Sequence, residues 1–106
     1  MKLLENAHTQ SEHNVLVDTE KVRIEQTKLS EDLSTTTITV APGGNYSFTA
    51  RSGMIQTYVG AGTITNGSES FELTLFNKLA VDRGEKVTMQ NTQDQIPLIV
   101  NIISAN

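Results

Sequence analysis

Short stretches of alternating apolar and polar residues make up most of this chain, and glycine, proline or asparagine separates them. A period of two is typical of strands that bury one face. The pattern predicts strands over residues 21–29, 34–40, 45–51, 54–65 (with a turn at 60–62), 70–76, 79–82, 86–92 and 96–103. Short strands at intervals of about eight to twelve residues, without a helical period, are typical of β-sandwiches and barrels. We therefore expect an all-β domain.

The sharpest local prediction is a hairpin around Asn66-Gly67. This pair favours the backbone of a tight turn, and it lies between strands predicted over residues 62–65 and 70–75. Alternation places three apolar side chains of the second strand on one dry face: Phe71, Leu73 and Leu75. The polar residues between them are expected on the other face.

The first residues of the chain differ from the rest, because they are polar and show no usable period. We expect a loose, flexible N-terminal arm over residues 1–14 and one β domain over residues 15–106. A strand near residues 15–17 is expected to pair at a sheet edge. The start lacks the apolar stretch of a signal peptide, and no apolar run reaches membrane-spanning length. We therefore expect a cytoplasmic protein that does not bind membranes.

Composition and charge narrow the chemistry. The net charge is −4, and the chain has three Phe, two Tyr and no Trp, so we expect neither the basic face nor the aromatic platforms of a nucleic-acid binding protein. The lack of cysteine excludes disulfides, thiolate catalysis and sulfur-ligated metals. Only 37% of the residues are hydrophobic. So small a core favours pairing with a second copy, and we expect a homodimer.

Turns rich in proline and glycine punctuate the strands from about residue 34 to residue 104. The main ones are Pro42-Gly43-Gly44, Gly60-Ala61-Gly62, Asn66-Gly67 and Asp82-Arg83-Gly84. Their order resembles that of the cupin family, and the spacing from Gly84 to Asn91 matches the end of that family's second motif. The resemblance implies a single-domain, cupin-like double-stranded β-helix, which is a jelly-roll barrel.

The resemblance also implies where metal ligands would lie. Counting from Gly43, the ligand positions of the family fall on Thr49, Arg51, Gln56 and Val87. These side chains do not supply the imidazole and carboxylate groups that hold a transition metal, and Arg51 adds a permanent positive charge. His8 and His13 lie in the predicted arm. We therefore expect no metal and no cofactor.

Arg51 is the residue with the clearest candidate chemistry. In the register of the resemblance, the side chains that point into the barrel are Ser47, Thr49 and Arg51. Those that point outward are Tyr46, Phe48 and Ala50. An inward guanidinium needs a partner, because burying it unpaired is costly. Two roles stay open: capture of a ligand's carboxylate or phosphate by the planar fork, or a salt bridge to Glu69, Glu72 or Asp82.

A mixed lining of apolar and polar side chains is expected around Arg51. The predicted ligand-binding residues are Thr49, Arg51, Gln56, Tyr58, Val87, Met89 and Asn91. Such a lining suits a small-molecule pocket and equally a barrel filled by its own side chains. The expected function is a metal-free module that binds a small anionic or carbonyl-containing ligand, or that serves to dimerise.

Two alternatives stay open. The chain could be a metal-independent isomerase, cyclase or lyase acting on a small carbonyl or sugar-like substrate, with Tyr58 or an Asp as acid and Arg51 stabilising an enolate or carboxylate. No histidine lies in the predicted β region to act as base, so whether the protein is an enzyme stays undecided. The chain could also be a protein–protein adaptor. Its apolar partner surface would then combine outward side chains of neighbouring strands, namely Tyr46 and Phe48 with Ile55 or Val59.

Overall fold

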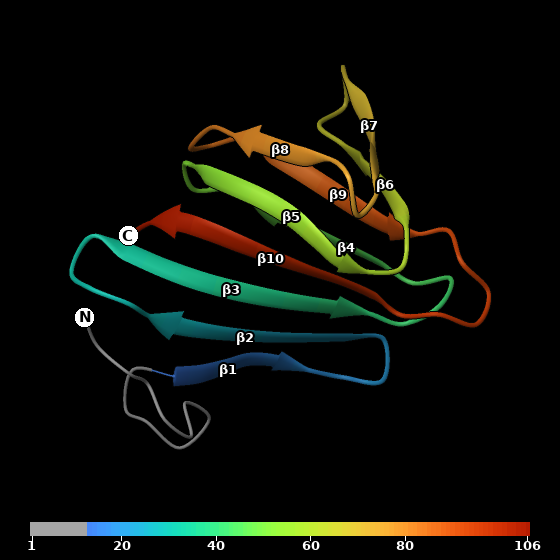
Figure 1. The fold of residues 1–106 in the computed structure, drawn as a ribbon, viewed down its shortest axis with the longest axis horizontal. Coiled ribbons are helices and arrows are strands. Elements are labelled where there is room, and N and C mark those ends of the chain that lie inside the picture. The colour runs from blue at the N-terminus through green and yellow to red at the C-terminus, as the bar shows by residue number, and fades with distance from the viewer. Residues whose placement is uncertain (1–12) are drawn as a thin grey trace.

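Two antiparallel sheets make up the described part of the chain. The computed structural model describes residues 13–106, which form ten strands (Figure 1). Sheet A has the strand order β1-β2-β3-β10-β5-β8, and sheet B has the order β4-β9-β6-β7. The strands are β1 His13–Asp18, β2 Val22–Lys28, β3 Leu33–Val40, β4 Asn45–Thr49, β5 Gly53–Val59, β6 Gly62–Thr65, β7 Ser70–Leu73, β8 Lys78–Val81, β9 Lys86–Asn91 and β10 Leu98–Ala105. Within residues 13–106, no helix is long and apolar enough to cross a membrane.

The core lies between the two sheets. In β10 every second side chain is buried, because successive side chains of a strand point to opposite faces. The best-buried apolar side chains of both sheets pack into one cluster, which includes Val40, Ile55, Ile64, Met89, Leu98 and Val100. Apolar burial stabilises a fold by about 25 cal/mol per Å², so this cluster is the main source of stability. The predicted all-β class is confirmed.

The predicted hairpin at Asn66-Gly67 is confirmed, with its loop over residues 66–69. Strands β6 and β7 pair antiparallel on either side of it. The side-chain oxygen of Asn66 accepts hydrogen bonds from the backbone N–H groups of Ser68 and Glu69, at 3.1 and 2.8 Å. Gly67 has a φ of +96°, which glycine adopts without steric strain. The asparagine and the glycine therefore each form the part of the turn that their chemistry favours.

The dry face expected after this loop is only partly present. Strand β7 ends at Leu73, because a turn follows in which the backbone N–H of Asn77 donates to the carbonyl of Thr74 at 3.2 Å. Leu73 is buried, whereas Phe71 and Leu75 are 47% and 55% exposed. The prediction of one continuous dry face is therefore wrong.

Strand β4 has the opposite orientation to the one that the resemblance implied. Tyr46 and Phe48 are half-buried against the core cluster, and Ala50 is buried. Ser47 and Thr49 are exposed, and the hydroxyl of Ser47 shares a 2.8 Å hydrogen bond with that of a threonine on β9. The prediction that Ser47 and Thr49 point inward is wrong. The opposite orientation would bury two hydroxyls in place of two aromatic rings. It would be less stable, because less apolar surface would be buried and two polar groups would lose their contact with water.

Strand β1 forms one edge of sheet A. It pairs with β2, which confirms the strand expected near residues 15–17, and it begins at His13. A bulge between Val15 and Val17 accompanies the placement of Leu16, which is 55% exposed, at the rim of a cavity between the sheets. Most of the predicted arm, including His8, lies outside the described residues.

Thr57 on β5 offers a test of the packing between the sheets. Its side chain is 2% exposed, and its hydroxyl oxygen has no hydrogen-bond partner among the described residues. We expect Thr57→Val, which has nearly the same shape, to raise the free energy of unfolding by about 1 kcal/mol, because it removes an unsatisfied polar atom. Urea denaturation followed by circular dichroism measures the change.

The matched control is Thr39→Val on β3, whose side chain belongs to the other face of sheet A. We expect a change within about 0.5 kcal/mol there. A loss of about 1 kcal/mol or more in Thr57→Val would mean that its hydroxyl is hydrogen-bonded in solution.

Candidate functional site

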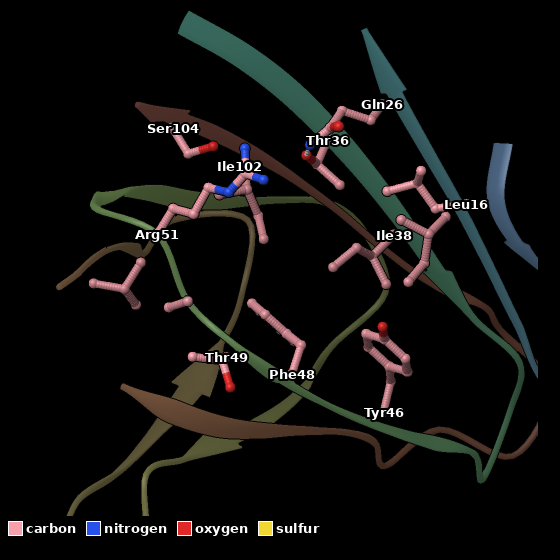
Figure 2. Close-up of a pocket in the computed structure, with 13 residues that line it drawn as sticks. Leu16, Gln26, Thr36, Ile38, Tyr46, Phe48, Thr49, Arg51, Ile102 and Ser104 are labelled. Atoms are coloured by element: carbon pink, nitrogen blue, oxygen red, sulfur yellow. Dashed lines mark hydrogen bonds between the residues drawn. The ribbon is translucent and has the colours of Figure 1, made fainter. Parts of the chain in front are cut away.

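A cavity of about 340 Å³ lies between the two sheets. Its walls come from β1, β2, β3 and β10 on one side and from β4 and the residues after it on the other (Figure 2). The volume is near the lower limit of the roughly 300–1,000 Å³ that is typical of small-molecule pockets. Apolar lining residues include Leu16, Ile24, Ile38, Tyr46, Phe48 and Ile102. The polar ones are Gln26, Thr36, Thr49, Arg51 and Ser104.

Two aromatic side chains of β4 form one wall of the cavity. Tyr46 and Phe48 lie two residues apart and therefore share a face of the strand. Their ring centroids are 5.8 Å apart, and the ring planes meet at 19°. Figure 2 shows both rings reaching from β4 toward β3 and β10, with the Tyr46 hydroxyl directed into the cavity. An offset pair of this kind is a favourable aromatic contact, so the wall is both apolar and well defined.

Arg51 supplies the positive charge of the cavity. It follows directly on Ala50, which is tied to the turn before β9 by two backbone hydrogen bonds of 2.7 and 2.9 Å. Figure 2 shows the Arg51 side chain extending into the cavity toward Ile102 and Ser104. The residue is exposed overall, so the guanidinium lies where both water and a ligand can reach it.

The salt bridge considered for Arg51 is absent from the described residues. The ion pairs within residues 13–106 join Arg23 to Asp18 and Glu25, at 2.8 and 3.0 Å. Arg51 forms none with the three predicted carboxylates, which are Glu69, Glu72 and Asp82. The salt-bridge role is therefore wrong, and the donors of this guanidinium are not used by residues 13–106.

The opposite wall carries a polar pair. Gln26 on β2 lies directly across from Thr36 on β3, and its amide nitrogen donates to the Thr36 hydroxyl at 3.3 Å. Figure 2 places this pair across the cavity from Tyr46 and Phe48. The cavity thus combines an aromatic wall, a cation and a neutral hydrogen-bonding pair.

The structure brings only two of the seven predicted ligand-binding residues to the cavity, and these are Arg51 and Thr49, which borders the cavity although its exposed side chain belongs to the other face of β4. Gln56 and Tyr58 belong to β5, in which the residues alternating with Gln56 are buried. Gln56 therefore lies on the outer face of sheet A, and Tyr58 is 55% exposed. The prediction that both point into the barrel is wrong. Because Tyr58 points outward, it cannot act as the acid of a reaction inside the barrel.

The other three predicted residues point inward, as expected, but none of them lines the cavity: Val87, Met89 and Asn91. Asn91 is 1% exposed. Its amide nitrogen donates to the carbonyls of Val40 and Ile96 at 3.0 and 2.9 Å, and its amide oxygen accepts from the backbone N–H of Gln93 at 2.9 Å. Both donors of the amide are therefore engaged by the main chain, and the role of Asn91 is structural.

The positions where the resemblance implied metal ligands do not fit a metal ion. Val87 is in the core, Gln56 is on the outer face of sheet A, and Thr49 and Arg51 are beside the cavity. They neither converge on one point nor supply imidazole or carboxylate groups. Within residues 13–106, no group of three or more His, Asp or Glu side chains could hold a metal ion.

A second cavity of about 200 Å³ lies beside the β6–β7 hairpin. Three carboxylates line it: Glu69, Asp82 and Glu85. The carboxylate of Glu85 accepts hydrogen bonds from the backbone N–H of Asp82 and the Asn66 amide, at 2.7 and 3.1 Å, and these hold its pKa below the usual value. Glu85 therefore ties the turn before β9 to the hairpin loop.

The apolar partner surface is composed differently from the prediction. Tyr46 and Phe48 face the cavity and Ile55 is buried. The prediction that these residues form an outward apolar patch is therefore wrong. Val59 is exposed, and it lies with other exposed apolar residues of β5 and β10 on the outer face of sheet A. The homodimer stays a prediction.

Gln26 and Thr36 line the cavity but were not predicted from the sequence, although the alternation of apolar residues in β2 and β3 indicates their direction. Val22 and Ile24 mark the buried face of β2, and the same period places Gln26 on that face. Ile38 and Val40 do the same for Thr36 on β3. A polar residue that continues a buried row of apolar residues was therefore the available signal.

Comparison with known proteins gave matches in fold but none in sequence, because neither the scan against family models nor the search of curated proteins found a match. A vicilin from Solanum melongena, which holds different anionic ligands in structurally similar pockets, matches with a TM-score of 0.77 at 13% identity, over 90% of this chain and 29% of that chain. The Cupin_2 domain of an XRE family transcriptional regulator from Enterobacter cloacae matches with a TM-score of 0.68 at 12% identity. This match covers 80% of this chain and 97% of that chain.

A third solved structure of similar fold is the polyketide cyclase RemF from Streptomyces resistomycificus. It has a TM-score of 0.66 at 12% identity and covers 81% of this chain and 66% of that chain. The three matches confirm the predicted jelly-roll class. Since a vicilin, a regulator domain and a cyclase share this fold, the function has to be argued from the cavity.

Proposed function

We propose that this chain, which has the cupin fold, is a metal-free module that binds a small organic anion. The observation that carries the proposal is the Arg51 guanidinium, which extends without a partner among residues 13–106 into a largely apolar cavity. Small-molecule pockets typically combine apolar walls with a few placed polar groups. The anionic group would lie at Arg51, and the apolar body against Phe48 and Ile102.

The chemistry of Arg51 favours a carboxylate or a similar oxyanion. The planar guanidinium donates two parallel hydrogen bonds to such a group. Because Arg51 lies at the open side of the cavity, the anion can keep part of its hydration, which lowers the desolvation cost of pairing. The anionic ligands of the Solanum melongena vicilin, which is similar in fold, support this ligand class.

The test uses cyclohexanecarboxylate as the probe, titrated into the isotope-labelled full chain and followed by NMR. We expect chemical-shift changes centred on the cavity residues Ile38, Phe48, Ala50 and Ile102. Arg51→Gln should weaken the affinity about tenfold or more. A charge-assisted hydrogen bond contributes about 1.5–3 kcal/mol, and about 1.4 kcal/mol corresponds to a factor of ten.

Lys78→Gln is the matched control, because it removes the same charge from an exposed position on β8 that does not line the cavity. Its affinity for the probe should equal that of the wild type. Equal binding by the wild type and Arg51→Gln, or shift changes centred away from the cavity, would contradict the proposal.

A further inference from the structure

We propose that the bound anion is an aromatic carboxylate, whose ring stacks on Phe48 while its carboxylate pairs with Arg51. This inference rests on the proposed function and specifies the ligand class of the same cavity. It depends on the arrangement of three side chains of one chain segment, Tyr46, Phe48 and Arg51, which follow one another along β4 and just beyond its end.

Phe48 and Arg51 line the same cavity, and both side chains reach into it from one chain segment. Phe48 lies between Tyr46 and Arg51 along the chain, and Tyr46 stacks on one side of it with planes 19° from parallel. Phe48 is only half-buried although it packs against the core, and the exposed part of its ring borders the cavity that Arg51 also lines. The ring and the guanidinium therefore border one space, and the cavity of about 340 Å³ has room there for one more flat group.

A flat anion satisfies both neighbours at once. Aromatic rings associate in offset stacks with centroids about 4.5–7 Å apart, so a third ring can extend the existing pair. A guanidinium is also attracted to ring faces within about 6 Å. In an aromatic carboxylate the charge is attached directly to the ring, so a ring beside Phe48 brings its carboxylate to Arg51.

Other anions use fewer of these features. Inorganic phosphate would pair with Arg51 but leave the exposed part of the Phe48 ring in contact with water. A saturated carboxylate would fill the space between Phe48 and the aliphatic wall of Ile38 and Ile102, yet its puckered ring cannot stack. Several anions can therefore pair with Arg51 and bury apolar surface in the cavity. Only an aromatic carboxylate can also stack a flat ring on Phe48.

The test compares benzoate with cyclohexanecarboxylate, which are alike in charge and size but differ in planarity, by calorimetric or NMR titration of the full chain. We expect benzoate to bind about threefold to tenfold more tightly, which is the range that an aromatic pair adds beyond burial. Phe48→Leu should remove this preference while binding still depends on Arg51. Tyr46→Leu, which leaves the Phe48 ring and Arg51 in place, should keep it.

The outcomes separate the two proposals. Equal affinities for the two probes in the wild type, both weakened by Arg51→Gln, would overturn the aromatic ligand class and leave the anion site standing. Absence of binding by both probes would overturn the two proposals together. If Phe48→Leu fails to fold, the nuclear Overhauser effects of wild-type protein decide: contacts of benzoate protons with the Phe48 ring are expected, and contacts elsewhere only would overturn the inference.

Discussion

Replacing Asn91 by Leu is expected to lower the free energy of unfolding by about 3 kcal/mol or more. The side chain is 1% exposed and makes hydrogen bonds to the main chain at Val40, Ile96 and Gln93. Leucine has a similar size but no polar atoms, so the three main-chain groups lose these bonds, of which the one to Val40 is fully buried and the other two are partly buried. Each buried polar group left without a partner costs about 1–3 kcal/mol.

Urea or guanidinium denaturation of the purified full chain measures this loss. Gln90→Leu is the matched control, since Gln90 is the exposed neighbour on the same strand and faces away from the core. We expect a change within about 0.5 kcal/mol for the control. A loss of less than about 1 kcal/mol in Asn91→Leu would show that the three main-chain groups find other partners.

Most of the fold could be predicted from the sequence, because strands and turns depend on local patterns. Alternation and turn residues located most of the ten strands of residues 13–106 to within a few residues, and Asn66-Gly67 marked its hairpin. The strand predicted to continue to residue 76 stops at Leu73, because the turn that follows depends on a backbone hydrogen bond between Thr74 and Asn77. Such a bond has no strong signature in residue types.

The candidate site could be predicted only in part. The importance of Arg51 followed from its residue type, but the residue type does not say whether the guanidinium pairs with a carboxylate of the chain, and the face of β4 was taken from motif spacing. The alternation of Tyr46 and Phe48 with Ser47 and Thr49 already indicates which side is apolar, and the structure follows this local pattern. Motif spacing is a weak guide to register here because the histidines that would anchor it are missing from the chain.

The cavity itself depends on tertiary structure. Gln26 and Thr36 reach it from sheet A, and Phe48 and Arg51 reach it from the other side. No local pattern says how far apart two sheets lie or which residues then face a gap. The buried polar residue Asn91 illustrates the same limit, because its inward direction followed from the period of β9, while its partners at Val40 and Ile96 come from other segments.

A second large loss of stability is expected for Gly60→Ala, at the turn between β5 and β6. Gly60 has a φ of +80°, a conformation that costs an L-residue about 1–2 kcal/mol. An added methyl group would also lie closer to the carbonyl oxygen of Pro97 than van der Waals contact allows. The neighbouring Leu98 is fully buried, so the obstacle cannot move without disturbing the core. We expect the free energy of unfolding to fall by about 2–4 kcal/mol.

Gly67→Ala separates the two causes of this loss. Gly67 also has a positive φ, of +96°, but an added methyl group there would meet nothing within 4 Å. Denaturation of both variants should show a loss of about 1 kcal/mol for Gly67→Ala and a clearly larger one for Gly60→Ala. The difference between them measures the contact with Pro97, because the backbone conformation is nearly matched. Equal losses would mean that the Pro97 segment yields to the methyl group, and that the approach of β10 to the β5–β6 turn is looser than the structure places it.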